Sequence, residues 1–278
     1  MKFYKMHGIG NDFVLIDRPY DERRDWSELA RRMCDRHFGI GSDGLLLIRE
    51  SAVADFRMIM FNPDGSEAEM CGNGIRCFAK HLYDNRLIYG TTVSVETGAG
   101  VKCLVIKPKG NLADRVVVDM GRPEFDPVKI PVVVEGLEAV DYPLLVGDRQ
   151  LYLTAVSMGN PHAVHFQDEP VDSFPLERIG PQVEHDALFP RRVNFEVARV
   201  ESRERIAVRV WERGAGITLA CGTGACATFA AARRKGLVDE RAILALPGGE
   251  LELRGGPEGQ VLMAGPAELA FAGEWPEV

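Results

Sequence analysis

Short apolar or alternating runs, each bounded by Gly, Pro, Asp or Asn, recur along the chain and predict β-strands. In the first half these runs are FVLID (13–17), GLLLI (44–48), DFRMIMF (55–61), TVSVE (92–96) and VKCLVI (101–106). The regular alternation of strands with helices that builds a doubly wound sheet is missing. The pattern therefore predicts a mixed fold in which strands outnumber helices.

Helical patterns are confined to a few segments. Residues 25–37 (DWSELARRMCDRH) predict a helix capped by Asp25, with Glu28 at the reciprocal capping position and Gly39 after its end. Two more helices are predicted over 75–84 (IRCFAKHLYD) and 225–236 (ACATFAAARRKG). The last is small and apolar nearly all round before a basic final turn, so we expect it to be buried.

A Cys-Gly stretch precedes each of the last two helices, and the two stretches are 150 residues apart, as Cys71 and Cys221 show. Other landmarks keep this spacing to within one residue: Asn11 with Asn160, Asn62 with Glu212, Leu87 with Leu237, and Gly98 with Gly248. Several landmarks that keep both order and spacing indicate two copies of one unit.

The duplication predicts the fold class and the domains. We expect an α+β fold of two pseudo-symmetric, like-folded halves, each a mixed or antiparallel sheet wrapped around a central helix, with the active site in the cleft between them. Residues 1–120 form the first repeat, whose sheet the C-terminal end of the chain is a candidate to complete. Residues 121–150, rich in Pro and Gly, form the crossover, and residues 151–278 form the second repeat.

The composition limits the kinds of molecule that the protein is expected to bind. The chain has 278 residues, 46% of them hydrophobic, and a net charge of −8, which disfavours an extended basic surface for nucleic acid or anionic lipid. No run is leader-like or long enough to span a bilayer, so we expect a cytoplasmic protein with its six cysteines reduced. None of them forms a C-x-x-C pair, so no metal site is expected. A small-molecule substrate is the default.

The position of the two cysteines suggests chemistry. If Gly72 and Gly222 open the buried helices, Cys71 and Cys221 lie at helix N-termini, where thiol pKa values fall from about 8.5 into the range of roughly 3.5 to 7.5. The bare N–H groups of the glycines can hold a carboxylate there. A thiolate base and a thiol acid on opposite faces of an α-carbon would invert a stereocentre.

Each of these features also has a structural explanation. A single Cys-Gly pair is more often structural than catalytic, and it is the duplication that favours catalysis. The NPDG sequence at Asn62 reads as a turn, as does Asn160-Pro161-His162, and Glu212-Arg213 could be an exposed ion pair. The other cysteines carry no catalytic signal: Cys77 and Cys226 are assigned to the core, and Cys34 and Cys103 to core or surface.

Five stretches resemble the diaminopimelate epimerase family. They are KMHGIGNDFVLID (5–17), NPDGSEAEMCGNGIR (62–76), SMGNPHAV (157–164), WERGAGITLACGTGA (211–225) and LPGGEL (246–251). The resemblance runs through most of the chain. It implies cofactor-independent interconversion of LL- and meso-diaminopimelate, in lysine and peptidoglycan precursor biosynthesis, by an isomerase that uses no pyridoxal phosphate.

The resemblance also assigns residues. It implies Cys71 and Cys221 as the proton donor and acceptor, with His162 and Glu212 helping to set their protonation. Substrate binding falls to Asn11, Asn62, Asn160, Asn194, Glu212 and Arg213, and to the backbone at Gly72-Asn73 and Gly222-Thr223. Ser42 and Gly44 stand where some members have Phe and Gln, which leaves a contact between residue 44 and the substrate open. Members are often dimers, so a homodimer is one expectation.

Two other hypotheses about the function stay open. Proline and hydroxyproline racemases also have paired Cys-Gly stretches, but their substrate lacks a second amino-acid head, against which Asn194, Glu212 and Arg213 argue. A PhzF-like isomerase is not expected to carry both thiols. A non-catalytic binding protein with a redox-sensitive cysteine pair is the alternative from another class.

Overall fold

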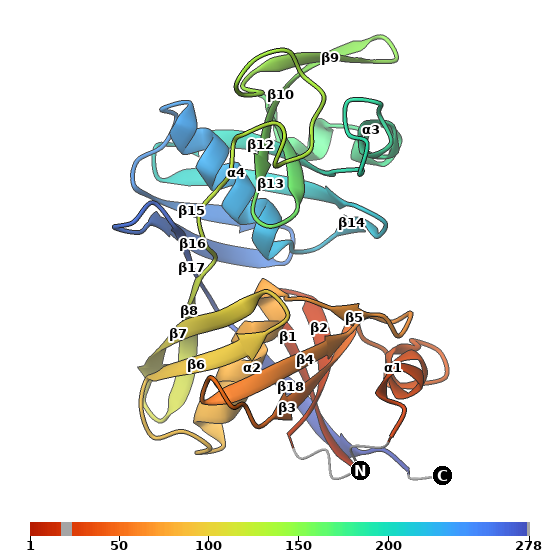
Figure 1. Cartoon of the computed structure of the whole chain (residues 1–278), viewed down its shortest axis with the longest axis vertical. Helices are drawn as coiled ribbons and strands as arrows, with labels where there is room; N and C mark the ends of the chain where they lie inside the picture. The colour runs from red at the N-terminus through yellow and green to blue at the C-terminus, as the bar shows by residue number, and fades with distance from the viewer. Residues whose placement is uncertain (18–23, 277–278) are drawn as a thin grey trace. The chain divides into compact units, whose positions relative to one another are not determined.

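The structure is a computed structural model that describes residues 1–17 and 24–276. The chain divides into two compact units, shown in Figure 1. The first unit comprises Met1–Asp119 and Ala264–Val278, and the second comprises Met120–Met263. None of the helices in the described ranges combines the length and apolar character needed to cross a membrane.

The described residues of the first unit form two helices and a set of strands. Its elements are β1 (Lys2–Gly8), β2 (Asn11–Ile16), α1 (Trp26–Cys34), β3 (Gly44–Arg49), β4 (Phe56–Phe61), β5 (Glu67–Ala68), α2 (Gly72–Asp84), β6 (Thr92–Thr97), β7 (Gly100–Lys109), β8 (Leu112–Asp119) and β18 (Glu268–Glu274). The strand expected in each apolar run of the first half is present.

The second unit repeats this order. Its elements are β9 (Tyr142–Val146), β10 (Arg149–Ser157), β11 (Pro161–Phe166), the 3₁₀ turn η1 (Val171–Ser173), α3 (Leu176–Glu184), β12 (Asn194–Ser202), β13 (Arg205–Glu212), β14 (Gly216–Thr218), α4 (Gly222–Arg234), β15 (Arg241–Leu246) and β16 (Gly249–Gly255). Strand β17 (Val261–Gly265) runs across the boundary between the units.

Strand pairing is the same in both units, strand by strand. In the first, β1–β2 is antiparallel, β2–β3 parallel, β3–β4 and β4–β5 antiparallel, β4–β6 parallel and β6–β7 antiparallel. In the second, β10–β11, β11–β12, β12–β13, β13–β14, β13–β15 and β15–β16 follow the same sequence of directions. The prediction of two like-folded α+β halves is confirmed.

One helix lies inside each sheet. Helix α2 packs against β1, β2, β3, β7, β8 and β18, and α4 packs against β10, β11, β12, β13, β15 and β16. Figure 1 shows each helix among the strands of its own unit. Every residue of α4 from Gly224 to Ala232 is buried, as its small apolar composition predicts.

The unit boundaries differ from those expected at 121–150 and 151–278. Residues 121–150 are part of the second unit: β9 pairs with β10, and Glu124 and Ser157 exchange backbone hydrogen bonds of 2.9 and 2.8 Å. The end of the chain belongs to the first unit instead of the second; there β18 pairs with β1 and completes the first repeat in the way that the sequence left open. The reason is that the equivalent strands β1 and β10 each pair with a second strand. For β1 this strand is β18, from the end of the chain, and for β10 it is β9, from the segment just before it.

Helix α1 is shorter than the expected 25–37. Asp25 caps it and accepts from the Glu28 N–H at 2.9 Å, but the Glu28 carboxylate pairs with Arg31 instead of closing a capping box. The helix ends at Cys34 because the Asp35 carboxylate accepts the backbone N–H groups of His37 and Phe38, both at 2.7 Å.

Candidate active site, described unit by unit

Cys71 and Cys221 are the N-cap residues of α2 and α4, as the sequence predicts. Both have extended backbone angles, φ −138° and ψ 121° for Cys71 and φ −122° and ψ 110° for Cys221. Each sulfur accepts from the N–H three residues on, at 3.4 Å from Gly74 and 3.3 Å from Gly224. The thiols therefore take the place of the Ser or Asp side chain that usually caps a helix.

In the first unit, Asn11 and Asn73 gather around Cys71. The Asn73 amide donates to Asn11 Oδ1 at 3.0 Å, and the Cys71 thiol donates to the same oxygen at 3.6 Å. Gly72 and Asn73 are buried in the first turn of α2. Four predicted site residues, Asn11, Cys71, Gly72 and Asn73, thus meet at the start of this helix.

The orientation of the Asn11 amide is held by charged groups. Its Nδ2 donates to Asp43 Oδ2 at 2.7 Å, and a carboxylate can only accept, so Oδ1 must face Cys71. Arg36 clamps Asp43 and Asp12 at 2.7 and 2.8 Å, and Lys5 also bonds Asp12. Burial alone would raise the pKa of Asp12, but its bonds from Arg36 and Lys5 outweigh burial and lower the pKa to about 2.

Asn62 sits in the turn that the NPDG sequence predicts. Its backbone carbonyl accepts from the Gly65 N–H at 2.9 Å, and its side-chain amide donates to Ser66 Oγ at 2.9 Å. Gly65 has a φ of +81°, which favours glycine there. Asn62 is half-buried, and the contacts that the structure gives it are those of a turn residue.

In the second unit, a chain of hydrogen bonds leads from a buried carboxyl group to Cys221. Glu196 Oε1 lies 2.7 Å from His162 Nδ1, and His162 Nε2 lies 3.0 Å from Asn160 Oδ1. The Asn160 amide donates to Thr223 Oγ1 at 3.5 Å, and this hydroxyl is 3.5 Å from the Cys221 sulfur. Parallel pairing of β11 with β12 brings His162 beside Glu196.

Glu212 faces the same thiol from the end of β13. It hydrogen-bonds with Cys221 and accepts from Thr218 Oγ1. Burial raises the pKa of Glu212, and the bonds from Thr218 and Cys221 only partly offset this. A carboxylate with a raised pKa in contact with a thiol is well placed to exchange a proton with it.

The expectation of a lowered thiol pKa is wrong for Cys221. Burial, and then the nearby carboxyl groups of Glu212 and Glu196, raise the pKa of Cys221 well above its ordinary value. The Thr223 hydroxyl and the Gly224 N–H act in the opposite direction but are weaker. The helix N-terminus was the only influence visible in the sequence, whereas the two carboxylates come from strands distant along the chain.

Asn194 and Arg213 lie next to each other, but their contacts are with the protein backbone. The Asn194 amide donates to the Pro161 carbonyl at 3.0 Å and accepts from the Arg213 N–H at 2.9 Å. The Arg213 guanidinium donates to the Arg191 carbonyl at 3.0 Å. Asn194 therefore ties β11, β12 and the end of β13 together.

Two of the structural explanations differ from what the structure shows. Pro161 and His162 belong to strand β11, because the turn before them already ends at Asn160. The side chain of His162 is fully buried. Glu212 bonds Thr218 and Cys221 rather than its neighbour Arg213. The remaining cysteines form no disulfide: Cys34, Cys77 and Cys226 are buried, and Cys103 is exposed.

The sequence did not predict three residues that lie at these sites, Glu196, Thr218 and Asp43. Glu196 left a signal, since it is a lone charge within the apolar run VNFEVA of a buried strand, where an acidic residue needs a partner. Thr218 and Asp43 left none, because their roles depend on strand pairing.

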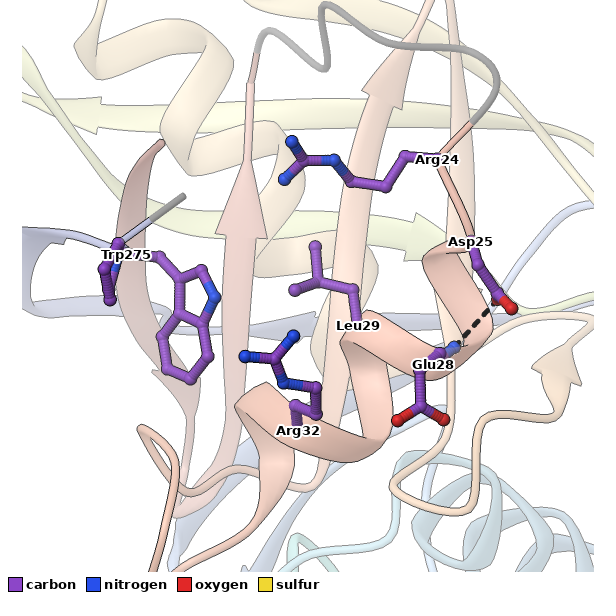
Figure 2. A pocket seen from close by; sticks show the side chains of 7 residues that line it. Arg24, Asp25, Glu28, Leu29, Arg32 and Trp275 are labelled. Carbon is purple, nitrogen blue, oxygen red and sulfur yellow. Dashed lines mark hydrogen bonds between the residues drawn. The ribbon is translucent and has the colours of Figure 1, made fainter. Parts of the chain in front are cut away.

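Across residues 1–17 and 24–276, no group of three or more His, Cys, Asp or Glu side chains is arranged to hold a metal ion. A pocket of about 250 Å³ lies in the first unit, and Figure 2 shows the side chains that line it. None of the predicted site residues lines it; its lining residues are Arg24, Asp25, Glu28, Leu29, Arg32, Trp275 and Pro276.

Solved structures of other proteins share the fold of this chain. A PhzF-family phenazine biosynthesis protein from Bacillus anthracis aligns with a TM-score of 0.73 over 100% of this chain and 99% of its own, at 18% identity. A hydroxyproline epimerase from Agrobacterium vitis aligns with a TM-score of 0.72 over 98% of this chain and 90% of its own, at 16% identity. The chain therefore has the same two-half fold as these two proteins.

The family follows from sequence similarity. A family model described as diaminopimelate epimerase matches residues 3–125 and 154–270. Diaminopimelate epimerases from Agathobacter rectalis and Acetivibrio thermocellus are each 47% identical to the chain, over 99% of it and over 99% and 98% of their own lengths. The chain belongs to the diaminopimelate epimerase family.

Proposed function

We propose that this chain, an isomerase of the diaminopimelate epimerase family, converts LL-diaminopimelate to meso-diaminopimelate with Cys71 and Cys221 as its two proton-transfer groups. The observation that carries the proposal is that both repeats place a cysteine at the N-cap of the enclosed helix, each within 3.4 Å of a backbone N–H. Packing gives no reason for a thiol to occupy the same place twice.

The reaction needs two groups in opposite protonation states. One cysteine, as a thiolate, takes the α-proton and becomes a thiol, while the other delivers its proton to the opposite face and becomes a thiolate. The electron pair left on the α-carbon spreads into the substrate carboxylate. The N–H groups that open α2 and α4, at Gly72-Asn73 and Gly222-Thr223, are proposed to hold that carboxylate.

The partners of Cys221 suit both of its roles. Its raised pKa keeps it a thiol, ready to donate. When it must act as a base, Glu212 is in contact to receive the thiol proton, and burial raises the pKa of this carboxyl group toward the range in which it can do so. No cofactor step is required in this scheme.

The asparagines are proposed as substrate ligands, with different parts. Asn11 and Asn160 lie beside the two cysteines, so they are placed to contact the reacting end. Asn62, Asn194, Glu212 and Arg213 are proposed to recognise the distal amino-acid head, which needs polar groups of both signs. The structure shows Asn194 and Arg213 fixing backbone, so their proposed role includes shaping the site.

A cytoplasmic location and a homodimer remain predictions. A reducing compartment suits the proposal because both groups must be thiols or thiolates, and none of the six cysteines forms a disulfide in the structure.

The test is to incubate the reduced protein with LL-diaminopimelate in D₂O, without added cofactor or metal, and to separate the stereoisomers by chiral chromatography. We expect meso-diaminopimelate with deuterium at one α-carbon. Exchange with proline or hydroxyproline but not diaminopimelate would assign the chain to the racemase class instead. No exchange with any of these acids would favour a non-catalytic binding protein.

A further inference from the structure

The two repeats fill the space beneath their helix starts with different chemistry. A methyl group built on Gly74 in α2 would lie 3.3 Å from Leu46 Cδ2 and 3.5 Å from Phe13 Cζ. The same addition at Gly224 in α4 would lie 2.7 Å from Glu196 Oε1. An apolar pair in the first unit is therefore replaced by a polar group in the second.

The pairing register shows that these positions are equivalent. Phe13 pairs with Gly44 across β2 and β3, and His162 pairs with Asn194 across β11 and β12, in parallel ladders of the same kind. Two residues further on in β3 and β12 lie Leu46 and Glu196. The Phe13 and Leu46 pair of one repeat thus corresponds to the His162 and Glu196 pair of the other.

Packing does not require the polar pair. The side chains of His162 and Glu196 are both 0% exposed, and removing a carboxyl group from water is unfavourable unless it is well compensated. The first unit shows that Phe and Leu fill the same space with full burial. A polar pair at this place therefore has a purpose other than packing.

That purpose is visible in the orientation of two equivalent asparagines. Asn11 is held by Asp43 and turns its amide oxygen toward Cys71. Asn160 accepts from His162 Nε2 through its oxygen and so turns its amide nitrogen toward Thr223, which contacts Cys221. Each repeat has its own device for fixing the amide, and the two devices fix it in opposite senses.

We propose that Glu196 is a positioning residue that keeps the proton of His162 on Nε2, so that Asn160 presents its amide NH₂ to the Thr223 and Cys221 end of the site. Asn160 Oδ1 can only accept, so His162 Nε2 must carry a hydrogen. Nδ1 then shares the second proton with Glu196 across 2.7 Å. An ionised Glu196 without that proton would draw the hydrogen of His162 to Nδ1 and leave Nε2 unable to donate.

The surroundings of Glu196 favour the state in which Glu196 and His162 share a proton between Oε1 and Nδ1. Its Oε2 is buried and has no hydrogen-bond partner among the described residues, which suits a neutral carboxyl group better than a carboxylate. Burial raises the pKa of Glu196, and His162 only partly offsets this. The other titratable groups here, Glu212 on β13 and Cys221 at the start of α4, add negative charge when ionised and so act in the same direction.

Three variants separate positioning from packing. Glu196→Gln keeps the size and offers an N–H to His162 Nδ1, so it mimics the protonated carboxyl group. Glu196→Leu takes the residue of the first repeat and removes the hydrogen bond. The double variant His162→Phe with Glu196→Leu reproduces the apolar pair of the first repeat, and is the control for folding by thermal melting and circular dichroism.

The first readout is the ¹⁵N NMR spectrum of the imidazoles, with His162 assigned by its absence in the double variant. We expect a hydrogen on Nε2 in the wild type and in Glu196→Gln, and loss of that preference in Glu196→Leu. An unchanged His162 tautomer in Glu196→Leu would overturn the inference. This readout needs no substrate, so it is independent of whether the chain acts on diaminopimelate.

The second readout rests on the proposed function. We expect kcat for diaminopimelate to fall about 10- to 100-fold in Glu196→Leu, and to stay within about threefold of wild type in Glu196→Gln. If Glu196 were only a packing residue, Glu196→Leu would be as active as the wild type once folded. Equal impairment of Glu196→Gln and Glu196→Leu would also contradict the role assigned here.

Discussion

Cys71 and Cys221 occupy the same structural position, the N-cap of a 13-residue helix that opens with Gly, in two units of identical strand pairing. Their neighbours are not the same. Cys71 contacts an amide oxygen, while Cys221 faces a hydroxyl group and two carboxyl groups. A repeated scaffold with different polar neighbours lets two chemically identical residues differ in protonation, which is what an acid and a base must do.

Replacing either cysteine should abolish catalysis without unfolding the protein. Ser is a preferred N-cap residue, so Cys71→Ser and Cys221→Ser should keep the melting temperature within a few degrees of wild type. Each removes one partner of a coupled proton transfer, so kcat should fall about 10²- to 10⁴-fold. Cys103→Ser, an exposed position, is the matched control and should remain fully active. Near wild-type turnover by either N-cap variant would refute the assignment.

The glycines in the first turns should differ in their tolerance of alanine. In Gly224→Ala the new methyl group would lie 2.7 Å from a Glu196 oxygen that His162 holds in place, so we expect a loss of about 1–3 kcal/mol in stability and at least a tenfold loss of activity. In Gly74→Ala the methyl group would lie 3.3 Å from Leu46 Cδ2 and 3.5 Å from Phe13 Cζ and Cys71 Cβ, with no closer contact, and the helix gains from alanine, so stability should change by less than about 1 kcal/mol. Denaturant unfolding measures the stability of each variant, and initial rates measure its activity. Equal effects of the two substitutions would contradict the difference between the surroundings of Gly74 and Gly224.

Asp12 should contribute stability that acid removes. Its pKa is lowered to about 2 from an ordinary 3.8, so its contribution is present above pH 4 and is lost as the pH falls toward 2. Asp12→Asn should therefore cost about 1–2 kcal/mol at pH 7, less than the full linkage value because Arg36 is half-exposed, and the difference should shrink at pH 3.

Urea unfolding of the wild type and Asp12→Asn at pH 7 and pH 3 measures this directly. Asp114→Asn, at an exposed aspartate on β8, is the control and should show little effect at either pH. A cost that does not depend on pH would mean that Asp12 acts through packing instead of charge.

Thr218 should tune the pH dependence of the reaction. Its hydroxyl donates to Glu212 and lowers the pKa of that carboxyl group, so Thr218→Val should raise the pKa further. If ionised Glu212 receives the thiol proton, the acid limb of the kcat/KM profile moves to higher pH in Thr218→Val. Thr218→Ser keeps the hydroxyl and should leave the limb in place. A limb that stays fixed in Thr218→Val would exclude Glu212 as the titrating group.

The local features of this fold were predictable from the sequence. Alternating runs became strands, and the buried helices begin at Gly72 and Gly222, because period-2 patterning and capping are properties of neighbouring residues. The offset between Cys71 and Cys221 revealed the duplication for the same reason, since both copies kept one order of elements.

Features that depend on strand pairing were not predictable. Glu196 meets His162 only because β11 and β12 lie side by side, although the two residues are 34 positions apart. The direction of the Cys221 pKa was mistaken because two of its causes, Glu196 and Glu212, come from other strands. The inclusion of residues 121–150 in the second unit likewise depends on strand pairing, between β9 and β10.

The central claim, that two thiols act on one α-carbon, is tested most directly by the isotopic pattern early in the reaction. LL-diaminopimelate is incubated with reduced enzyme in D₂O, the reaction is stopped at a few per cent conversion, and product and recovered substrate are analysed separately by mass spectrometry. We predict one deuterium in the meso product and none in the recovered substrate, because the proton is removed by one group and replaced by another. Deuterium in the recovered substrate at the same rate as in the product would show a single exchanging base and contradict the account.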